Sequence, residues 1–591
     1  MTIRQEIINT IISQTQLTQD YVVSCWGKSA RPELGDYSLA CFRLAKERSK
    51  SPQQTAEEIA SLIKPTDLIE KVQAVGGYVN IFLNPTKVVE LVLKNDIKIP
   101  DYGNGKTIVI DYSSPNIAKP FGIGHLRSTV IGNALYKIYQ ALGYRCIGIN
   151  FLGDWGTQFG MLIADYKENK EKVYDSVLGK GLSNKFYSTF LAERYVEYNE
   201  RAKTDPKLMD KAREEFKKLE NGDTENKEIW KYFRNSSILE FDRIYNLLGI
   251  RFKLGPVENQ ITRYYSGEED TNKYINQTID EIKEKRLSEI SEEALVVKLD
   301  KYNMPPCLLR KSDGATLYAT RDIAAAIHRY NTYKFHKLIY VVGSDQKLHF
   351  RQIFKVLELM DYPWAKDCSH IDFGLVRFKD ASGEKQKMST RKGTTILLED
   401  VLNEAIERSE RIMKERSPEL ASKVTPENMK EVAQAVGIGA IIFNDLKNKR
   451  IKDVDFDWEQ ILSFDGETGP YLQYTHTRLA SLLEKYNQIN PKSQIPNPKY
   501  ELLNTPEEIA IVKSLSEFSD VIQQSAEEYE PSILSNYLLG LASLFNRYYQ
   551  FHRIITEDNE LSGARIYMVN RLKGVFNQGL TLLGITPLEK M

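Results

Sequence analysis

The first stretch suited to chemistry is SSPNIAKPFGIGHLRST, residues 113–129, in which Lys119 and His125 flank Gly122 and Gly124. It follows a β-rich run and opens a helical pattern, so backbone N–H groups should gather there at a helix N-terminus. Such a terminus attracts anions, because its free N–H groups and the macrodipole both favour negative charge. Glycines let a ligand approach the backbone. The stretch predicts a phosphate site, although a plain glycine turn with a solvated lysine and a capping histidine fits the same residues.

A second basic loop, KMSTRKG, lies far downstream at 387–393, after another strand of the same predicted sheet. It would present Lys387, Met388, Ser389 and Arg391 to a ligand. Taken alone, it is better explained as a solvated loop. Placed opposite the first loop, it would clamp a triphosphate from two sides. Transfer at phosphorus needs mainly positioned cations and N–H groups from a protein, so the two loops together indicate a nucleotide site.

Alternating strands and helices must position these loops. Residues 107–114 and 145–151 are rich in β-formers, and between them apolar residues recur at steps of three and four over 125–142. This βαβ unit implies a parallel sheet with ligands at the carboxyl ends of its strands. The runs KLIYVV (337–342) and HIDFGLV (370–376) resume the alternation.

Changes in composition divide the rest of the chain. Residues 1–104 mix helical pattern with short strands, residues from about 165 to 250 are charged and helical, and helical patterns dominate after about 405. We therefore predict domains at 1–104, 105–405 and 406–591. The expected fold is an α/β Rossmann-like domain with a helical insertion, an N-terminal α+β module and a C-terminal all-α bundle.

The composition excludes several classes of protein. The 591 residues are 42% hydrophobic and 27% charged, and 80 Lys and Arg balance 80 Asp and Glu, so any nucleic-acid footprint must be regional. Five cysteines without C-x-x-C spacing argue against a disulfide framework or a zinc site, and we predict no metal ligands. No apolar run reaches the roughly 20 residues of a membrane helix, and the N-terminus lacks a secretory signal. We expect a cytoplasmic protein without membrane contact.

Longer strings resemble one family. GIGH at 122–125 and KMSTR at 387–391 resemble the HIGH and KMSKS motifs of class I aminoacyl-tRNA synthetases. Four more specific strings are similar to arginyl-tRNA synthetases: SSPNIAKPFGIGHLRST, LGDWGTQFG, SDGATLYATRDIAAA and GETGPYLQYTHTR. The resemblance runs from GDYSLACF near the start to LLGITPLEKM at the end. It implies a catalytic Rossmann domain, an N-terminal module that contacts the tRNA elbow, and a helical bundle that reads the anticodon.

The resemblance also implies the reaction and the site. Arginine and ATP, with Mg²⁺, would give arginyl-adenylate and pyrophosphate, and the arginyl group would pass to the 3′ end of tRNA(Arg) with release of AMP. We expect a monomer. Positions matching the arginine pocket are Ser114, Asn116, His125, Glu258, Tyr318, Asp322 and Gln346. Positions matching the catalytic and ATP-binding sets are Lys119, Gly122, Gly124, His125, Lys387, Met388, Ser389 and Arg391.

The arginine positions suit their ligand. A guanidinium is a planar cation with five donors, so its pocket should offer carboxylates and a flat wall. Tyr318 and Asp322 are four residues apart and would share one face of a helix. The alternative is an ordinary helix start in which Asp322 pairs with Arg321 or a nearby lysine. Ser114 and Asn116 would hold the α-amino and carboxylate groups, and a plain turn is the alternative for them.

Two positions depart from the family motifs. Gly122 stands at the first histidine of HIGH, and Thr390 stands where KMSKS has its second lysine. We expect Lys119 to supply the missing charge and His125 to stabilise the transition state at the α-phosphate. Asp154 in LGDWG matches the family, but no chemical role follows for it.

The bundle positions that match the family's anticodon contacts are Tyr471, Tyr474, Tyr549 and Met591. Unpaired RNA bases stack on aromatic rings, and core packing is the alternative for each tyrosine. Two other functions stay open. One is a nucleotidyltransferase acting on a small molecule, which would not need the long helical C-terminal third. The other is an inactive relative that binds RNA, which Gly122 would suit.

Overall fold

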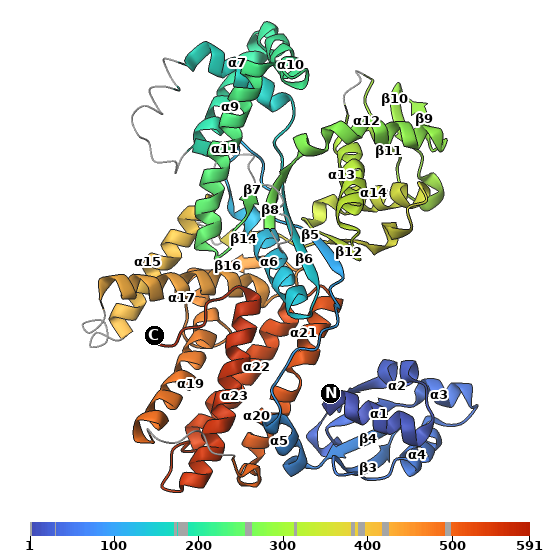
Figure 1. The fold of residues 1–591 in the computed structure, drawn as a ribbon, viewed down its shortest axis with the longest axis vertical. Helices are drawn as coiled ribbons and strands as arrows, with labels where there is room; N and C mark the ends of the chain where they lie inside the picture. Colours follow the sequence, from blue (N-terminus) through green and yellow to red (C-terminus); the bar gives the residue numbers. More distant parts are fainter. Residues whose placement is uncertain are drawn as a thin grey trace.

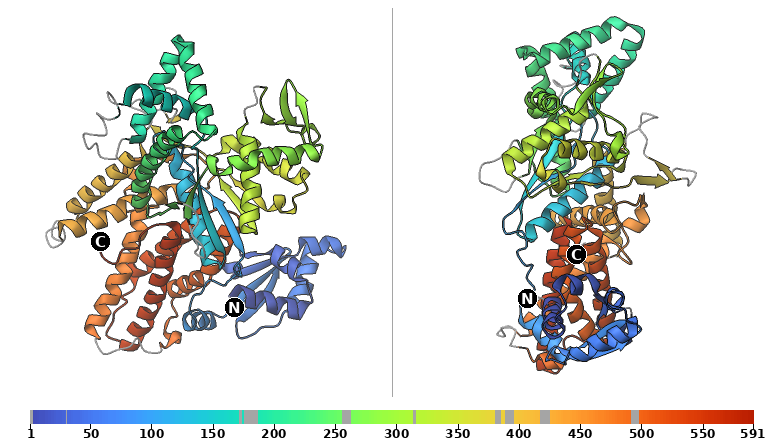
Figure 2. Two further views of the ribbon diagram at one scale, coloured as in Figure 1. Left: turned by 45° about the horizontal axis from the view of Figure 1, so that its top comes forward. Right: turned by 90° about the vertical axis from the view of Figure 1, so that its right-hand side faces the viewer.

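The structure, a computed structural model, describes residues 3–29, 31–170, 174, 187–254, 263–312, 316–379, 385–387, 396–416, 425–490 and 498–591. A parallel sheet occupies the middle of an elongated molecule, with a helical insertion above it in Figure 1 and a helical bundle below it. The N-terminal module lies beside the bundle, and Figure 2 shows the same arrangement from other directions. In these described ranges, no helix combines the length and apolar character needed to cross a membrane.

The central sheet has six strands in the order β13-β12-β5-β6-β8-β7, and all neighbouring strands are parallel. They are β5 (Thr107–Asp111), β6 (Arg145–Leu152), β7 (Lys253–Leu254), β8 (Arg263–Gly267), β12 (Lys337–Val341) and β13 (Cys368–Ile371). Central strands of a parallel sheet are buried on both faces, which explains the continuous apolar runs of β5 and β6. Because the strands point the same way, the loops after them meet at one side, the carboxyl edge.

Helix α6 (Leu126–Ala141) follows the first basic loop, as its apolar spacing predicted. The polar residues Arg127, Ser128 and Thr129 are buried as well. Arg127 faces the bundle and donates to Asp445 at 2.9 Å, whereas Ser128 donates to the Val341 carbonyl of β12 at 2.6 Å and Thr129 Oγ1 lies 2.7 Å from Ser113 Oγ. Gly132 lets the helix approach β5 closely: a Cβ there would lie 2.3 Å from Cβ of Tyr112.

Two insertions extend from the sheet. The first, after β6, contains α7 (Thr157–Asn169), α9 (Tyr187–Thr204), α10 (Pro206–Glu220) and α11 (Thr224–Leu247). The second, after β8, contains α12 (Glu268–Glu284), the antiparallel strands β9 (Ser288–Ser291), β10 (Ala294–Val297) and β11 (Cys307–Arg310), and α13 (Tyr318–Tyr333). Helix α14 (Lys347–Leu359) follows β12.

The run HIDFGLV spans the end of β13 and the start of another strand. The chain leaves the central sheet after Ile371, and Arg450 holds the next residue by donating from Nη1 to the carbonyl of Asp372 at 2.6 Å and to its carboxylate at 2.9 Å. A small separate sheet follows, formed by β14 (Val376–Lys379), β15 (Lys385–Lys387) and β16 (Val454–Phe456).

The N-terminal module covers a four-stranded antiparallel sheet with helices, as expected from the helical pattern and short strands of residues 1–104. Its elements are α1 (Ile3–Thr15), α2 (Gln19–Cys25), β1 (Trp26–Lys28), β2 (Tyr37–Ala40), α3 (Phe42–Glu47), α4 (Pro52–Leu62), β3 (Ile69–Val75) and β4 (Tyr78–Leu83). Helix α5 (Pro85–Lys94) then packs against the bundle.

The bundle forms the C-terminal third, as its helical patterns predicted. Its helices are α15 (Leu398–Arg416), α17 (Pro426–Leu446), α18 (Trp458–Ile461), α19 (Gly469–Ile489), α20 (Pro506–Ser516), α21 (Phe518–Glu527), α22 (Ser532–Phe551) and α23 (Asn559–Leu583). Gly584 ends α23 with a left-handed φ of 84°, which glycine adopts without strain. The tail from 585 to 591 then runs along α19, held by bonds such as Gln473 Nε2 to the Thr586 carbonyl at 2.9 Å.

Candidate active site and C-terminal pocket

The GIGH loop, residues 113–125, leaves the carboxyl end of β5 and is anchored by buried hydroxyl groups. Ser113 Oγ lies 2.6 Å from the hydroxyl of Tyr245 and 2.7 Å from that of Thr129. Ser128 Oγ accepts from the Ser113 N–H at 2.8 Å. These bonds hold Ser113 in a left-handed conformation, with φ of 72°. The sequence analysis missed this anchor, although hydroxyl residues at both ends of SSPNIAKPFGIGHLRST signal it.

Ser114 and Asn116 lie between the carboxyl ends of β5 and β6. Ser114 Oγ donates to Asp111 Oδ1 at 2.8 Å and accepts from the Phe151 N–H at 3.2 Å. Asn116 bridges to Gly153, where a Cβ atom would come within 2.0 Å of the Asn116 side-chain oxygen. Both side chains are half-buried at the carboxyl edge, which is where ligands bind in such sheets.

Asp111 connects the GIGH loop to helix α13. This carboxylate is buried at the end of β5 and forms an ion pair with Arg329 at 2.7 Å. Burial raises the pKa of Asp111 in spite of the guanidinium beside it. The pair fixes α13, which carries Tyr318 and Asp322, against the strand that carries the loop. The sequence analysis did not single out Asp111; its signal was an acidic residue ending an apolar strand.

The GIGH residues form a short 3₁₀ turn, η2 (Ile123–His125), at the start of α6. Gly122 has φ of −82° and ψ of 165°, an ordinary extended conformation that any residue adopts. His125 Nδ1 lies 3.2 Å from the Gly122 carbonyl oxygen, which only accepts, so Nδ1 carries the proton in this contact. Burial lowers the pKa of His125, and the charge of Lys119 lowers it further. The loop therefore presents a neutral imidazole beside the exposed ammonium of Lys119.

The second basic loop begins at the end of β15, and residues 396–398, which follow it in sequence, lie beside the GIGH loop. Lys387, the last residue of β15, pairs with Arg377 of β14, while Met388, Ser389, Thr390 and Arg391 lie outside the described residues. Where the description resumes, the Ile396 carbonyl accepts from Ile123 N–H at 3.1 Å, and Leu398 N–H donates to the Phe121 carbonyl at 2.9 Å. Between these bonds Gly122 and Leu397 form an antiparallel bridge. Hydrogen bonds therefore hold residues 396–398, between the second loop and α15, against the GIGH loop.

Tyr318 and Asp322 lie on the first two turns of α13, as their spacing predicted. The alternative pairing of Asp322 with Arg321 is wrong: Arg321 binds Glu268 at 3.1 Å, and Asp322 faces α14, where it lies 2.6 Å from His349 Nε2. Tyr318 is 66% exposed, so its ring is open to a ligand. Gln346 is exposed in the 3₁₀ turn η6 (Ser344–Gln346) after β12, and Glu258 lies outside the described residues.

Two further buried carboxylates stand at the carboxyl edge. Asp154 accepts from Arg234 Nε at 2.9 Å and from the Glu269 N–H at 3.3 Å, so it fastens the start of α12 and has a structural role. Burial raises its pKa to about 6. Burial likewise raises the pKa of Glu268, to about 7, although Arg321 opposes the shift. The carboxyl edge therefore holds several buried carboxylates, each of which is paired with an arginine of the same chain.

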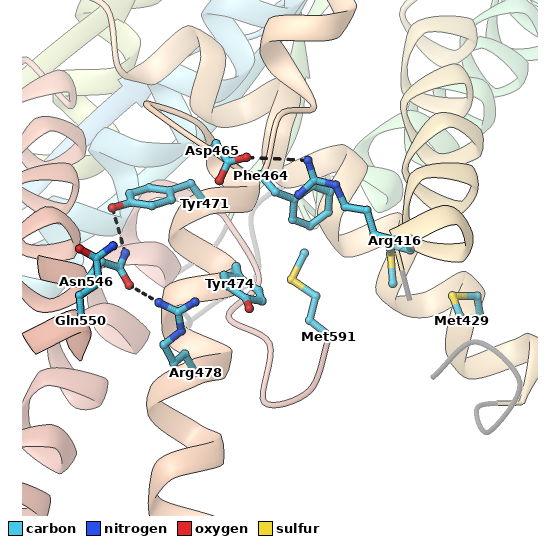
Figure 3. A pocket seen from close by; sticks show the side chains of 11 residues that line it. Arg416, Met429, Phe464, Asp465, Tyr471, Tyr474, Arg478, Asn546, Gln550 and Met591 are labelled. Carbon is cyan, nitrogen blue, oxygen red and sulfur yellow. Dashed lines mark hydrogen bonds and ion pairs between the residues drawn. The ribbon is translucent and has the colours of Figure 1, made fainter. Parts of the chain in front are cut away.

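The bundle contains a cavity of about 720 Å³, shown in Figure 3, which gathers three of the predicted RNA-binding residues in its lining. Asn546 donates to the hydroxyl of Tyr471 at 2.9 Å and accepts from Arg478 at 2.7 Å. The Arg478 guanidinium lies 4.8 Å from the ring centre of Tyr474 and 5.0 Å from that of Tyr549. Tyr474 and Tyr549 are 42% and 40% exposed, so neither ring is a core residue.

The opposite side of this cavity is largely apolar. Met591, the last residue, projects into it from the tail, together with Met413 and Met429. Phe464 completes the wall, with Arg416 5.1 Å from its ring centre. Aromatic rings, a guanidinium and unbranched methionines suit a planar ligand such as an RNA base.

Comparison with known proteins covers all parts of the chain. Three family models match: "Arginyl tRNA synthetase N terminal domain" at residues 2–83, "tRNA synthetases class I (R), catalytic domain" at 88–458, and "DALR anticodon binding domain" at 472–591. Curated relatives named arginine--tRNA ligase include one from Alkaliphilus metalliredigens, 45% identical over 95% of this chain and 94% of its own length. One from Clostridium botulinum is 42% identical over 99% of both chains.

Solved structures share the fold along the whole chain. Arginyl-tRNA synthetase from Thermus thermophilus matches with a TM-score of 0.81 and 24% identity over 100% of both chains. The enzyme from Plasmodium falciparum matches with a TM-score of 0.79 and 24% identity over 100% of this chain and 99% of its own. The predicted fold class is confirmed. By these matches, the chain belongs to the arginyl-tRNA synthetases, within class I of the aminoacyl-tRNA synthetases.

Proposed function

We propose a division of the family's reaction, the ATP-dependent ligation of arginine to tRNA, among the residues at the carboxyl edge. The observation that carries the proposal is the hydrogen-bonded pairing of the GIGH loop with residues 396–398. It keeps residues 396–398, which follow the second basic loop in sequence, beside the N-terminus of α6. An ATP bound there meets backbone N–H groups from the helix start and cations from both loops.

ATP is held by Gly122, Gly124, His125, Lys387 and Met388 in this proposal. The glycines leave the loop surface uncovered, and His125, once it has gained a proton on Nε2, donates from that nitrogen to the α-phosphate as negative charge grows there. Lys119 projects from the same loop into solvent and supplies the charge that Gly122 lacks. Ser389 and Arg391 complete the clamp on the other side. Mg²⁺ would enter with the triphosphate, whose oxygens are the ligands this ion prefers.

Arginine lies between the GIGH loop and α13. Ser114 and Asn116 bind its α-amino and carboxylate groups, and the Asp322 and Glu258 carboxylates bind the charged side chain with Tyr318 as the flat wall. Gln346 closes the pocket from the end of β12. The support is that Ser114, Asn116, Tyr318, Asp322 and Gln346 all come from loops or helix starts at one edge of one sheet.

In this proposal the tRNA is read at the cavity of Figure 3, where Tyr471, Tyr474 and Met591 receive anticodon bases. Tyr549, which lies outside the lining with its ring centre 5.0 Å from the Arg478 guanidinium, offers a further stacking surface. The domain boundaries at 104 and 405, a monomeric state and a cytoplasmic location are further parts of the proposal. A monomer suffices because the residues assigned to ATP, arginine and tRNA all come from one chain.

Arginine-dependent ATP–pyrophosphate exchange, measured with and without tRNA(Arg), tests the proposal. We expect exchange with arginine and little with citrulline, whose side chain has the same length but carries no charge. ATP–pyrophosphate exchange in which tRNA(Arg) neither takes part nor acts as an inhibitor would favour a nucleotidyltransferase acting on a small molecule. Tight binding of tRNA(Arg) without exchange under either condition would favour an inactive RNA-binding protein.

A further inference from the structure

The contact between His349 and Asp322 has a function of its own. His349 lies on the first turn of α14, and its Nε2 is 2.6 Å from Asp322 Oδ2 on α13. Both side chains are largely buried, with 24% and 22% exposure. We infer that His349 is a positioning residue: it orients the Asp322 carboxylate so that the substrate guanidinium finds it already in place. The inference rests on the role proposed above for Asp322.

The surroundings of Asp322 explain why the carboxylate needs such a partner. Asp111 and Glu268 stand close enough that the charge of Asp322 contributes to raising their pKa values. The negative charges of Asp111 and Glu268 repel the carboxylate of Asp322. The two nearby guanidinium groups are already engaged, Arg329 with Asp111 and Arg321 with Glu268. Among the residues that the structure describes, His349 is the hydrogen-bond donor to Asp322.

The contact leaves Asp322 able to bind substrate. No hydrogen bond to Oδ1 comes from any residue in the described ranges, and Oδ2 keeps a second lone pair. A guanidinium can therefore dock its fork of N–H groups on the carboxylate while His349 retains its own bond. The histidine is held in turn, because its ring packs at a right angle to Phe350 with 5.4 Å between centres, and Phe350 is buried. Holding a binding group in its productive rotamer before the ligand arrives saves the cost of ordering it.

The test is steady-state ATP–pyrophosphate exchange with four variants of the full chain. His349→Ala removes the donor, His349→Gln restores an N–H at similar reach, Asp322→Asn removes the charge that binds substrate, and the fourth combines His349→Ala with Asp322→Asn. His328→Ala is the matched control, since His328 lies on the same helix as Asp322 but stacks on Tyr274 instead. Thermal unfolding of each variant confirms that it is folded.

We expect His349→Ala to raise the KM for arginine on the order of 10-fold, the loss typical of a supporting hydrogen bond, with the KM for ATP and kcat within about 2-fold. His349→Gln should recover most of this loss, and His328→Ala should show none. The double variant should be no worse than Asp322→Asn alone, because His349 acts only through Asp322. An unchanged KM for arginine in His349→Ala, equal losses for arginine and ATP, or additive losses in the double variant would overturn the inference.

These outcomes separate the inference from the proposal beneath it. If Asp322→Asn itself leaves the KM for arginine at the wild-type value, the role of Asp322 falls and the inference falls with it. If Asp322→Asn raises that KM and His349→Ala does not, only the positioning role of His349 is lost.

Discussion

Replacing Tyr474 with alanine should weaken tRNA binding without disturbing the bundle. The ring is 42% exposed at the rim of the cavity in Figure 3, so its removal opens no hole in the core. Arg478 covers one side of the ring at 4.8 Å, which leaves room for one stacked base. One base–aromatic stack contributes about 1–3 kcal/mol, and 1.4 kcal/mol corresponds to about 10-fold in Kd. We therefore expect Tyr474→Ala to bind tRNA(Arg) roughly 5- to 150-fold more weakly.

The measurement is equilibrium binding of a tRNA(Arg) transcript at one fixed salt concentration, because phosphate contacts make affinity depend on salt. Tyr474→Phe is the matched control; it keeps the ring and should bind within about 2-fold of wild type. A transcript with an altered anticodon loop completes the design, since Tyr474→Ala should lose less on this change than wild type does. Equal affinity of Tyr474→Ala and wild type, with unfolding midpoints alike, would refute the stacking role.

Three other outcomes follow from the same structure. Asp322→Asn should lower arginine affinity by about 1–3 kcal/mol, the range for a hydrogen bond to a charged group, and calorimetry that gives the wild-type affinity would contradict this. Since the pKa of His125 is lowered and Nδ1 faces a carbonyl, Nε2 must gain a proton to donate to phosphate. ATP binding should then take up a proton and weaken as pH rises, and calorimetry in two buffers should detect the uptake in wild type but not in His125→Asn. Arg127→Ala leaves Asp445, which it meets at 2.9 Å, buried without its charge partner, so stability should fall by about 3–5 kcal/mol, seen as a lower midpoint of thermal unfolding; an unchanged midpoint would count against the pair.

Local patterns in the sequence carried much of the fold. The steps of three and four after His125 predicted α6, because burial of a helix face repeats apolar residues at that spacing. The apolar runs at 107–114 and 145–151 predicted β5 and β6, because strands buried on both faces are apolar throughout. The burial of Arg127 could not be predicted in this way. It depends on α17 covering the helix, and Asp445 is 318 residues away in sequence.

The residues of the candidate site were likewise predictable where a local sequence pattern marks them, and not where they depend on long-range contacts. Glycine, lysine and histidine at a strand-to-helix turn marked the GIGH loop, and a spacing of four placed Tyr318 and Asp322 on one helix. Arg321, the charge nearest in sequence, was the alternative partner for Asp322, but the contact in space is with His349, which lies 27 residues further on. The bridge between Gly122 and Leu397 is also long-range, and no local pattern reports it.

The central claim is that two basic loops hold ATP at the start of α6 and that Lys119 replaces the charge missing at Gly122. Single-turnover formation of arginyl-adenylate by Lys119→Ala, with arginine binding measured alongside, tests it most directly. Removing one charge-assisted contact from a developing phosphate charge typically costs on the order of 10²-fold in rate. We expect Lys119→Ala to lose adenylate formation by a factor of that size while its arginine affinity stays unchanged. Adding Gly122→His to this variant should restore part of the rate, since the backbone at Gly122 has an ordinary extended conformation. A wild-type rate of adenylate formation in Lys119→Ala would contradict the account.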